Sequence, residues 1–318
     1  MGSTIGGQAV PEGVMLRGGA GWALAVRRTD GTIAVSTERF RTPRRRLATR
    51  PFVRGLAALA GALPLGLRSL ALAAQLRHPT PPPPPTLRAR VWGTISLVVA
   101  IAFAAGLFGL LPATLASTVD ADGALGRAVE PGLRTIAIVG YIAAIGLLPD
   151  VRRVFAYHGA EHQVVTAHEG GAAVSATVAR RHSRFHPRCG TTFVLLVALT
   201  EGIVHALGVL PSSPIVRLVE LPVAIMVAYE VLYLATAHRD RWWARVVLAP
   251  GRALQRLTTR PPDEQQLEVG CAALHALLQL ERSSEDQDQQ QDDQDQSDET
   301  AADVHGISSS AAPVAVPA

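Results

Sequence analysis

The sequence predicts a mainly α-helical polytopic membrane protein, with about four transmembrane helices, one interfacial or re-entrant helix, a small N-terminal β-hairpin element and a disordered C-terminal tail. Of its 318 residues, 48% are hydrophobic and only 18% are charged, whereas about 25% are charged in typical soluble domains. Several apolar stretches approach or exceed the roughly 20 residues that a helix needs to cross a bilayer. Arginines flank these stretches at alternate ends, which is typical of repeated membrane crossing.

Four stretches are predicted to span the membrane. Pro131 is well placed as the first helical residue of the second one. Arginine clusters precede the first and third stretches and follow the second and fourth. The positive-inside rule then places both termini and the loop at 150–190 in the cytoplasm, at the cell inner (plasma) membrane. The predicted spans are residues 91–118, 131–149, 191–210 and 216–237.

A fifth apolar stretch, residues 55–76, is interpreted as interfacial or re-entrant. It contains Pro64, Arg68 and several glycines. If it crossed the membrane, one of the basic clusters that flank it would lie outside, against the positive-inside rule. We therefore expect it to lie at the bilayer surface.

The remaining segments are expected to lie in the cytoplasm. Thr29-Asp30-Gly31 separates two alternating segments within residues 20–40, which indicates a hairpin. The predicted organisation is a glycine-rich loop and β-hairpin at 1–54, the interfacial helix and a proline-rich linker at 55–90, the membrane domain at 91–237, amphipathic helices at 238–281 and a disordered acidic tail at 282–318.

The charge distribution favours a membrane surface over nucleic acid. Residues 281–318 hold 10 of the 26 acidic and one of the 30 basic residues, which leaves 29 basic and 16 acidic residues in the body. A basic body with long apolar runs suits an anionic membrane surface. The interleaving of aromatic and basic residues that is typical of RNA-binding proteins is absent from the sequence. The expected partners are the lipid bilayer and an unidentified substrate, without nucleic acid.

The most specific motif is the run Tyr157-His-Gly-Ala-Glu-His162. On a helix, His158 and His162 share one face because they are four residues apart, so both imidazoles can point at one centre. Glu161 borders the same centre. This is the spacing of a divalent-metal half-site, and H-x-x-E-H is also the inverted zinc-hydrolase pattern.

A second cluster, His186-Pro-Arg-Cys-Gly-Thr191, leads directly into the third predicted span. The loop at 150–190 holds five of the ten histidines, and the second and third spans deliver both clusters to one membrane face. Imidazole, carboxylate and thiolate together suit a divalent metal such as Zn²⁺. The alternative is a polar helix face at the level of the lipid headgroups. The candidate metal ligands are His158, His162, Glu169, His186 and Cys189.

These residues resemble the YqhQ-like bacterial membrane proteins, domain-of-unknown-function family 1385, which are often labelled predicted metal-dependent enzymes. The resemblance implies a multi-span inner-membrane protein whose motifs face the cytoplasm, and it implies no established reaction. The matching segments cover residues 5–280 in order and include Ile5 to Gly18, Pro51 to Gly55, Tyr157 to His162, Glu169, His186 to Thr191, Tyr229-Glu230 and Leu254 to Arg260.

Three functions follow as hypotheses. The first is a membrane-bound metal-dependent hydrolase in which Glu161 is the general base. In this hypothesis Glu12 and Arg17, on a loop with five glycines between residues 6 and 19, approach the site, and Arg17 stabilises an anionic intermediate. The second is a non-enzymatic scaffold or regulator with a structural metal or a polar clasp. The third is a transporter that uses Glu201, His205 and Glu230.

Overall fold

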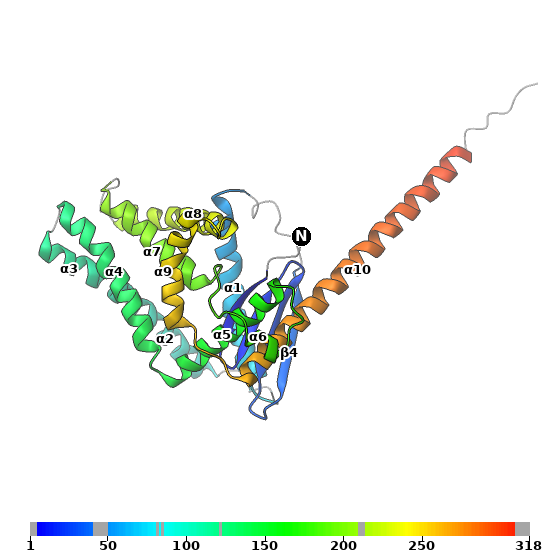
Figure 1. Cartoon of the computed structure of the whole chain (residues 1–318), viewed down its shortest axis with the longest axis horizontal. Coiled ribbons are helices and arrows are strands. Elements are labelled where there is room, and N and C mark those ends of the chain that lie inside the picture. Colours follow the sequence, from blue (N-terminus) through cyan, green and yellow to red (C-terminus); the bar gives the residue numbers. More distant parts are fainter. Residues whose placement is uncertain are drawn as a thin grey trace, which may run out of the picture.

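The computed structural model describes residues 5–40, 50–80, 83, 86–120, 123–208 and 214–308. A group of long helices lies on one side of the molecule, and a small β-sheet covered by helices lies on the other (Figure 1). The long helix α10 projects away from both (Figure 1). The predicted mainly helical fold with a small N-terminal β element is confirmed.

The sheet is a four-stranded antiparallel meander in the order β1-β2-β3-β4. The predicted hairpin corresponds to β3 and β4, and Asp30 accepts a hydrogen bond from the Thr32 amide in its turn. The glycine-rich segment, which we expected to be a loop, adds two strands, with Glu12 at a positive φ of 58° between them. The strands are β1 Gly6–Val10, β2 Gly13–Arg17, β3 Gly21–Arg27 and β4 Ile33–Arg39.

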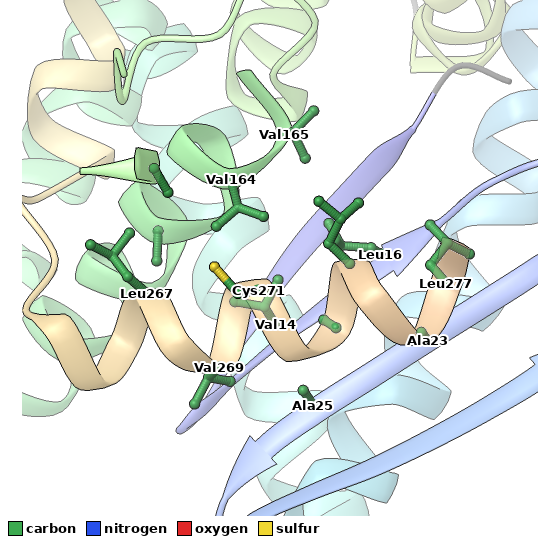
Figure 2. Packing of buried hydrophobic residues seen from close by; sticks show 14 of the residues in the cluster. Val14, Leu16, Ala23, Ala25, Val164, Val165, Leu267, Val269, Cys271 and Leu277 are labelled. Carbon is green, nitrogen blue, oxygen red and sulfur yellow. The ribbon is translucent and has the colours of Figure 1, made fainter. Parts of the chain in front are cut away.

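Each face of the sheet packs against different helices, because successive side chains of a strand point to opposite faces. Val14 and Leu16 face α5 (Pro149–Glu169) and α10 (Glu264–Ser308), as Figure 2 shows. Met15 belongs to the core on the other face, which is covered by α1 (Val53–Leu76). The sheet therefore lies between α1 and the pair α5 and α10.

Within the described residues, four helices are long and apolar enough to cross a membrane, as predicted in number. Their identity differs in one case, because α1 meets the criterion whereas α7 has only 17 residues. The candidate spans are Val53–Leu76, Leu87–Val119, Ala124–Ile145 and Glu220–Ala237. The span Leu87–Val119 consists of α2 Leu87–Ala105, a π-helical turn η1 Gly106–Leu110 and α3 Leu111–Val119. The other apolar helices besides α1 are α4 Ala124–Ile145, α7 Gly190–Ala206 and α8 Pro214–Ala237.

The two ends of α1 have different surroundings. Near its start, the Phe52 amide and the Arg54 guanidinium both donate to Glu230 of α8. Toward its end, Leu72 and Ala73 pack against the sheet. One face of α1 thus packs against the sheet, whereas Leu63 and Leu67 are each 62% exposed, and the length and composition of the helix permit a span.

Pro131 lies inside α4 and does not begin it, contrary to the prediction, because α4 already starts at Ala124. A Cβ added to Gly202 of α7 would lie only 2.7 Å from the Pro131 side chain, so the two helices meet closely there. A proline inside a membrane helix is tolerated where neighbouring helices compensate for the lost backbone hydrogen bond.

Helices also occupy much of residues 150–190 and part of the acidic tail. The loop at 150–190 contains α5 and the short α6 (Ala176–Ala179). In the acidic tail, predicted to be disordered, α10 continues as a helix to Ser308, and residues 309–318 lie outside the described residues. Extending a packed helix requires no new nucleus. The seven aspartates among residues 282–308 are weak helix formers, so the continuation follows from the packed part of α10 and not from local propensity.

Candidate metal centre

Helix α5 places His158 and His162 on one face, and their ring centroids are 4.4 Å apart. The helix begins with Pro149 at its first position and Asp150 in its first turn. A proline fits there because its missing amide hydrogen is not needed, and an acidic side chain is favourable beside the helix N-terminus. The i,i+4 half-site predicted from the sequence is present in this helix.

Cys189 reaches the two histidines from the N-terminus of α7. Its Sγ atom lies 3.3 Å from His158 Nε2 and 3.1 Å from Thr191 Oγ1. One ligand atom each from His158, His162 and Cys189 all lie within 4.8 Å of one another. Cys189 is the N-cap residue of α7, which places its sulfur at the start of that helix, beside the histidine pair. The cluster could hold a metal ion.

Both imidazoles are oriented by backbone carbonyls. His158 Nδ1 lies 2.9 Å from the Thr258 carbonyl oxygen, and His162 Nδ1 lies 2.6 Å from the carbonyl of Arg184. A carbonyl oxygen only accepts, so each Nδ1 carries the hydrogen and each Nε2 keeps a lone pair. Histidine ligands in metal sites typically donate a hydrogen bond in this way from the ring nitrogen that does not bind the metal.

His162 is only 2% exposed. Burial lowers the pKa of its imidazole, although Cys189 and the Arg184 carbonyl partly oppose that effect. The lowered pKa keeps the ring neutral, which is the protonation state that coordinates a metal.

Two of the five predicted ligands, Glu169 and His186, lie outside the three-residue cluster. His186 Nε2 is 3.3 Å from Glu169 Oε2, and Arg188 also binds that carboxylate. Burial alone would raise the pKa of Glu169, but the hydrogen bond from His186 and the charge of Arg188 outweigh it and hold the pKa below its usual value. The His186 ring centroid lies 5.6 Å from that of His162, so this pair borders the cluster without joining it.

Helix α9 (Trp242–Thr258) supports the site through Gln255, which the motif analysis did not single out. The Gln255 side chain accepts from the His186 amide at 2.9 Å and donates to the His186 carbonyl at 2.9 Å. It also donates to Thr192 Oγ1 at 3.0 Å. Gln255 is fully buried, and its place in the segment Leu254 to Arg260, one of those that carry the family resemblance, is the sequence signal that could have indicated it.

A close contact between α5 and the chain after α9 brings Thr258 to His158. A Cβ added to Gly159 would lie 2.1 Å from the Arg260 carbonyl oxygen, so no larger residue fits at this crossing. The Arg260 amide in turn donates to the Phe155 carbonyl at 2.9 Å. Glycine at position 159 is therefore required for the approach that orients the first histidine.

Glu161 occupies a neighbouring face of α5 and meets the sheet. A Cβ added to Gly7 of β1 would lie 2.5 Å from its Oε1 atom, so the carboxylate rests against the strand backbone. Burial raises the pKa of Glu161 to about 7, and the charge of nearby His158 opposes this only in part. The carboxyl group is thus close to the histidines but directed toward β1.

Glu12 binds α5 and does not reach the cluster. Arg153 Nη2 donates to its Oε2 at 2.7 Å, and the Tyr157 hydroxyl donates to the same oxygen at 3.2 Å. Burial would raise the pKa of Glu12, but the hydrogen bond and charge of Arg153 outweigh it and keep the pKa below its ordinary value. Glu12 therefore fixes the position of α5 relative to the sheet.

Arg17 lies on the sheet face opposite to the cluster. Its neighbour Leu16 faces α5 and α10, so alternation points Arg17 toward the α1 side. There the Arg17 side chain passes beside Gly6, and its Nε would lie 3.4 Å from the Cβ of an alanine at position 6. The structure thus does not bring Arg17 to the histidines, because its strand register was hidden in a segment interpreted as a loop.

Fold and site define a class: a helical protein with four candidate membrane spans, a small sheet and a His/Cys cluster between α5 and α7. The model of the family described as "Protein of unknown function (DUF1385)" matches residues 50–280. The chain is 32% identical over 304 residues to "Uncharacterized protein YqhQ" of Bacillus subtilis (strain 168), covering 88% of this chain and 94% of that protein. No solved structure matches. The chain belongs to the DUF1385 family.

Proposed function

We propose that this protein is a membrane-bound metal-dependent hydrolase whose ion is held by His158, His162 and Cys189. The observation that carries the proposal is the convergence of three nitrogen and sulfur ligand atoms within 4.8 Å, contributed by two helices. Structural zinc sites use four protein ligands, whereas catalytic sites use three and leave a position open. Three ligands therefore favour catalysis over a structural metal staple.

Zn²⁺ fits the donor set, because imidazole and thiolate are its preferred ligands. Such an ion supplies Lewis-acid chemistry when it is bound. In the proposal His158 and His162 would hold the ion through Nε2 and Cys189 would hold it through Sγ. Glu161, which lies on the neighbouring face of α5 against β1, would be the general base that the H-x-x-E-H pattern assigns. Glu12 acts as a positioning residue through Arg153, and Arg17 has no role in the chemistry.

The site is proposed to lie at the cytoplasmic face of the inner membrane. Arg152 and Arg153 follow the end of α4, and Arg184 and Arg188 precede α7. Both arginine clusters lie at the same end of the membrane helices as the cysteine and histidine ligands. The positive-inside rule assigns that end to the cytoplasm. A substrate would then reach the site from the cytosol or from the inner lipid leaflet.

Metal content tests the proposed ligand set. Full-length protein purified from cells is expected to contain one equivalent of metal per chain, and His158→Ala and Cys189→Ala are expected to lose it. His168→Ala, on the same helix but outside the cluster, is the matched control and should retain the metal. Equal metal content in all four proteins would refute the assignment.

An open coordination position separates a hydrolase from a structural site. In protein loaded with Co²⁺, the visible spectrum reports the ligands directly, and added azide should change it if a position is free. A spectrum that azide leaves unchanged, with the metal still bound, would favour the scaffold hypothesis.

A cysteine nucleophile is a second candidate function, favoured by the 3.3 Å contact between His158 Nε2 and Cys189 Sγ. A histidine held by a third group beside a thiol is the usual arrangement that activates a cysteine. Cys189→Asp distinguishes the two functions because aspartate can ligate Zn²⁺ but offers no thiol. If the Cys189→Asp protein retains its metal and still restores growth to a strain that lacks the wild-type protein, a cysteine nucleophile is excluded.

A further inference from the structure

Helix α9 packs against the protein along one side only. At one point on that side the contact is very close, because a Cβ added to Gly251 would lie 2.3 Å from Thr192 Cγ2 of α7. The opposite side of α9 is exposed along the whole helix. The buried residues recur at the spacing of one helix face and are Ala244, Leu248, Gly251, Leu254, Gln255 and Thr258.

The exposed side of α9 divides into a basic stripe and an apolar stripe. At about 100° per residue, four arginines fall within roughly 60° around the helix axis, and the exposed apolar residues fill roughly the next 100°. Trp242 is 76% and Val246 is 63% exposed, although both side chains are large and apolar. We call the two sets the arginine stripe, Arg241, Arg245, Arg252 and Arg256, and the apolar stripe, Trp242, Val246, Ala249, Pro250, Ala253 and Leu257.

The arginine stripe has no acidic partner among the residues that the structure describes. Arg252 Nη2 donates to the Arg245 carbonyl oxygen at 3.3 Å, which leaves both positive charges uncompensated. None of the four guanidinium groups forms an ion pair with a described carboxylate. A row of like charges beside an apolar stripe favours a partner that is anionic and apolar at once.

Helix α9 lies along the side of the membrane domain where α8 ends and α7 begins. Near the start of α9, the ring centroid of Trp243 is 5.9 Å from that of His238, which directly follows α8. Near its other end, Gln255 Nε2 donates to Thr192 Oγ1 in the first turn of α7 at 3.0 Å. In Figure 1, α9 runs across the direction of α8. If α8 crosses the bilayer, α9 therefore follows the membrane surface.

We propose that α9 is an interfacial helix that binds anionic phospholipid. The apolar stripe lies among the upper parts of the acyl chains, and the arginine stripe binds the lipid phosphates. Helices that lie in a membrane surface combine a basic face with a face that carries tryptophan and aliphatic residues. Trp242, at the start of the apolar stripe, is of the residue type enriched at the level of the headgroups.

A second copy of the chain fits this surface less well. In a two-fold symmetric interface the same patch meets itself, so the arginine stripes of both copies would be brought together. Like charges placed side by side in an interface are unfavourable. An anionic lipid layer supplies an apolar layer for one stripe and counter-charges for the other.

Quenching of Trp242 fluorescence by brominated lipid tests the inference. Full-length protein is placed in nanodiscs of equal parts phosphatidylglycerol and phosphatidylcholine, with bromine on the acyl chains of one lipid or of the other. The Trp242 signal is the wild-type fluorescence minus that of Trp242→Phe. Brominated phosphatidylglycerol is expected to quench this signal about fivefold more strongly than brominated phosphatidylcholine, which is the preference that one arginine near an anionic surface supplies.

Neutral variants of the arginine stripe separate the two parts of the surface. In Arg245→Gln/Arg252→Gln/Arg256→Gln the apolar stripe is intact, so both labels should still quench Trp242, but to the same extent. Glutamine is about as good a helix former as arginine, so α9 should keep its helical structure. The double variant Arg245→Gln/Arg256→Gln should also reduce the preference, and it serves if the triple variant does not insert.

The matched control is Arg180→Gln/Arg181→Gln/Arg282→Gln, which removes the same charge from exposed positions after α6 and on α10. It should keep the wild-type preference. Equal quenching of the wild type by the two labels would overturn the inference, as would loss of the preference in the control. Absence of Trp242 quenching by either label would also overturn it, because a protein surface, such as a second copy of the chain, would then cover the apolar stripe.

Discussion

Cys189 Sγ lies 3.3 Å from His158 Nε2, although 31 residues separate them in the chain. The contact joins the middle of α5 to the N-cap residue of α7, and the two helices come together there because α9 lies against both. The Thr258 carbonyl orients His158, and Gln255 holds the segment before Cys189. The candidate metal centre is therefore a product of three helices, of which only one carries the histidine pair.

The two cysteines should differ in reactivity. Cys189 is expected to resist alkylation while metal is bound and to react after chelation, because removal of the ion frees its sulfur. Cys271 should stay unreactive in both states, since burial, with a smaller contribution from Glu268, raises its pKa to about 11. Mass spectrometry of alkylated peptides, before and after chelator, measures both. Chelator-independent labelling of Cys189 would contradict the prediction.

Gln255→Leu should weaken metal binding without removing a ligand. The substitution deletes three hydrogen bonds and leaves the His186 backbone groups buried without partners, at a cost of about 1–3 kcal/mol in stability. Loss of such supporting contacts typically lowers metal affinity about 10–100-fold. Competition with a metal indicator measures the affinity. The exposed Gln265→Leu is the control, and equal affinities in the two variants would remove Gln255 from the site.

The parts of the site that could be predicted are those set by local periodicity. His158 and His162 share a face because a helix repeats every 3.6 residues, and this is visible in the sequence. The pairing of His186 with Glu169, and not with the cluster, depends on where the chain after α6 folds back. No sequence spacing encodes that path.

The structure of the N-terminal glycine-rich segment was also only partly predictable from the sequence. Its glycines indicated close backbone approaches, and Gly7 does lie directly against Glu161. However, the segment forms strands, and strand alternation sends Arg17 to the face away from α5. A segment interpreted as a loop carries no prediction of which side chains share a face, so this separation could not be foreseen.

The topology prediction concerns which side of the membrane holds the segment before α4 and which holds the segment after α5. In a cysteine-free protein, a cysteine introduced at position 173, beyond α5, should be labelled by an impermeant maleimide only after the cells are opened. A cysteine at position 122 should be labelled in intact cells, because the alternating arginines place the segment before α4, which begins at Ala124, outside. Labelling of position 173 in intact cells would reverse the orientation and move the His/Cys cluster out of the cytoplasm.

Glu12 should make the junction between the sheet and α5 sensitive to acid. Its pKa is lowered because the hydrogen bond and charge of Arg153 outweigh the effect of burial. A carboxyl group with a lowered folded-state pKa contributes stability above its ordinary value of 4.5 and loses it as pH falls toward the folded-state value. Glu12→Gln should therefore lower the Tm at neutral pH, and the difference from wild type should shrink below pH 4.5.

The control for Glu12 is Glu38, which forms an ion pair with Arg68 at 2.7 Å on the other edge of the sheet. Both partners of that pair are exposed, at 38% and 61% of their side chains, so solvent screens the interaction and Glu38→Gln should change the Tm little at any pH. The Glu12 carboxylate is only 14% exposed and is bound by two α5 side chains. If both variants give the same small, pH-independent change, Glu12 does not hold α5 against the sheet.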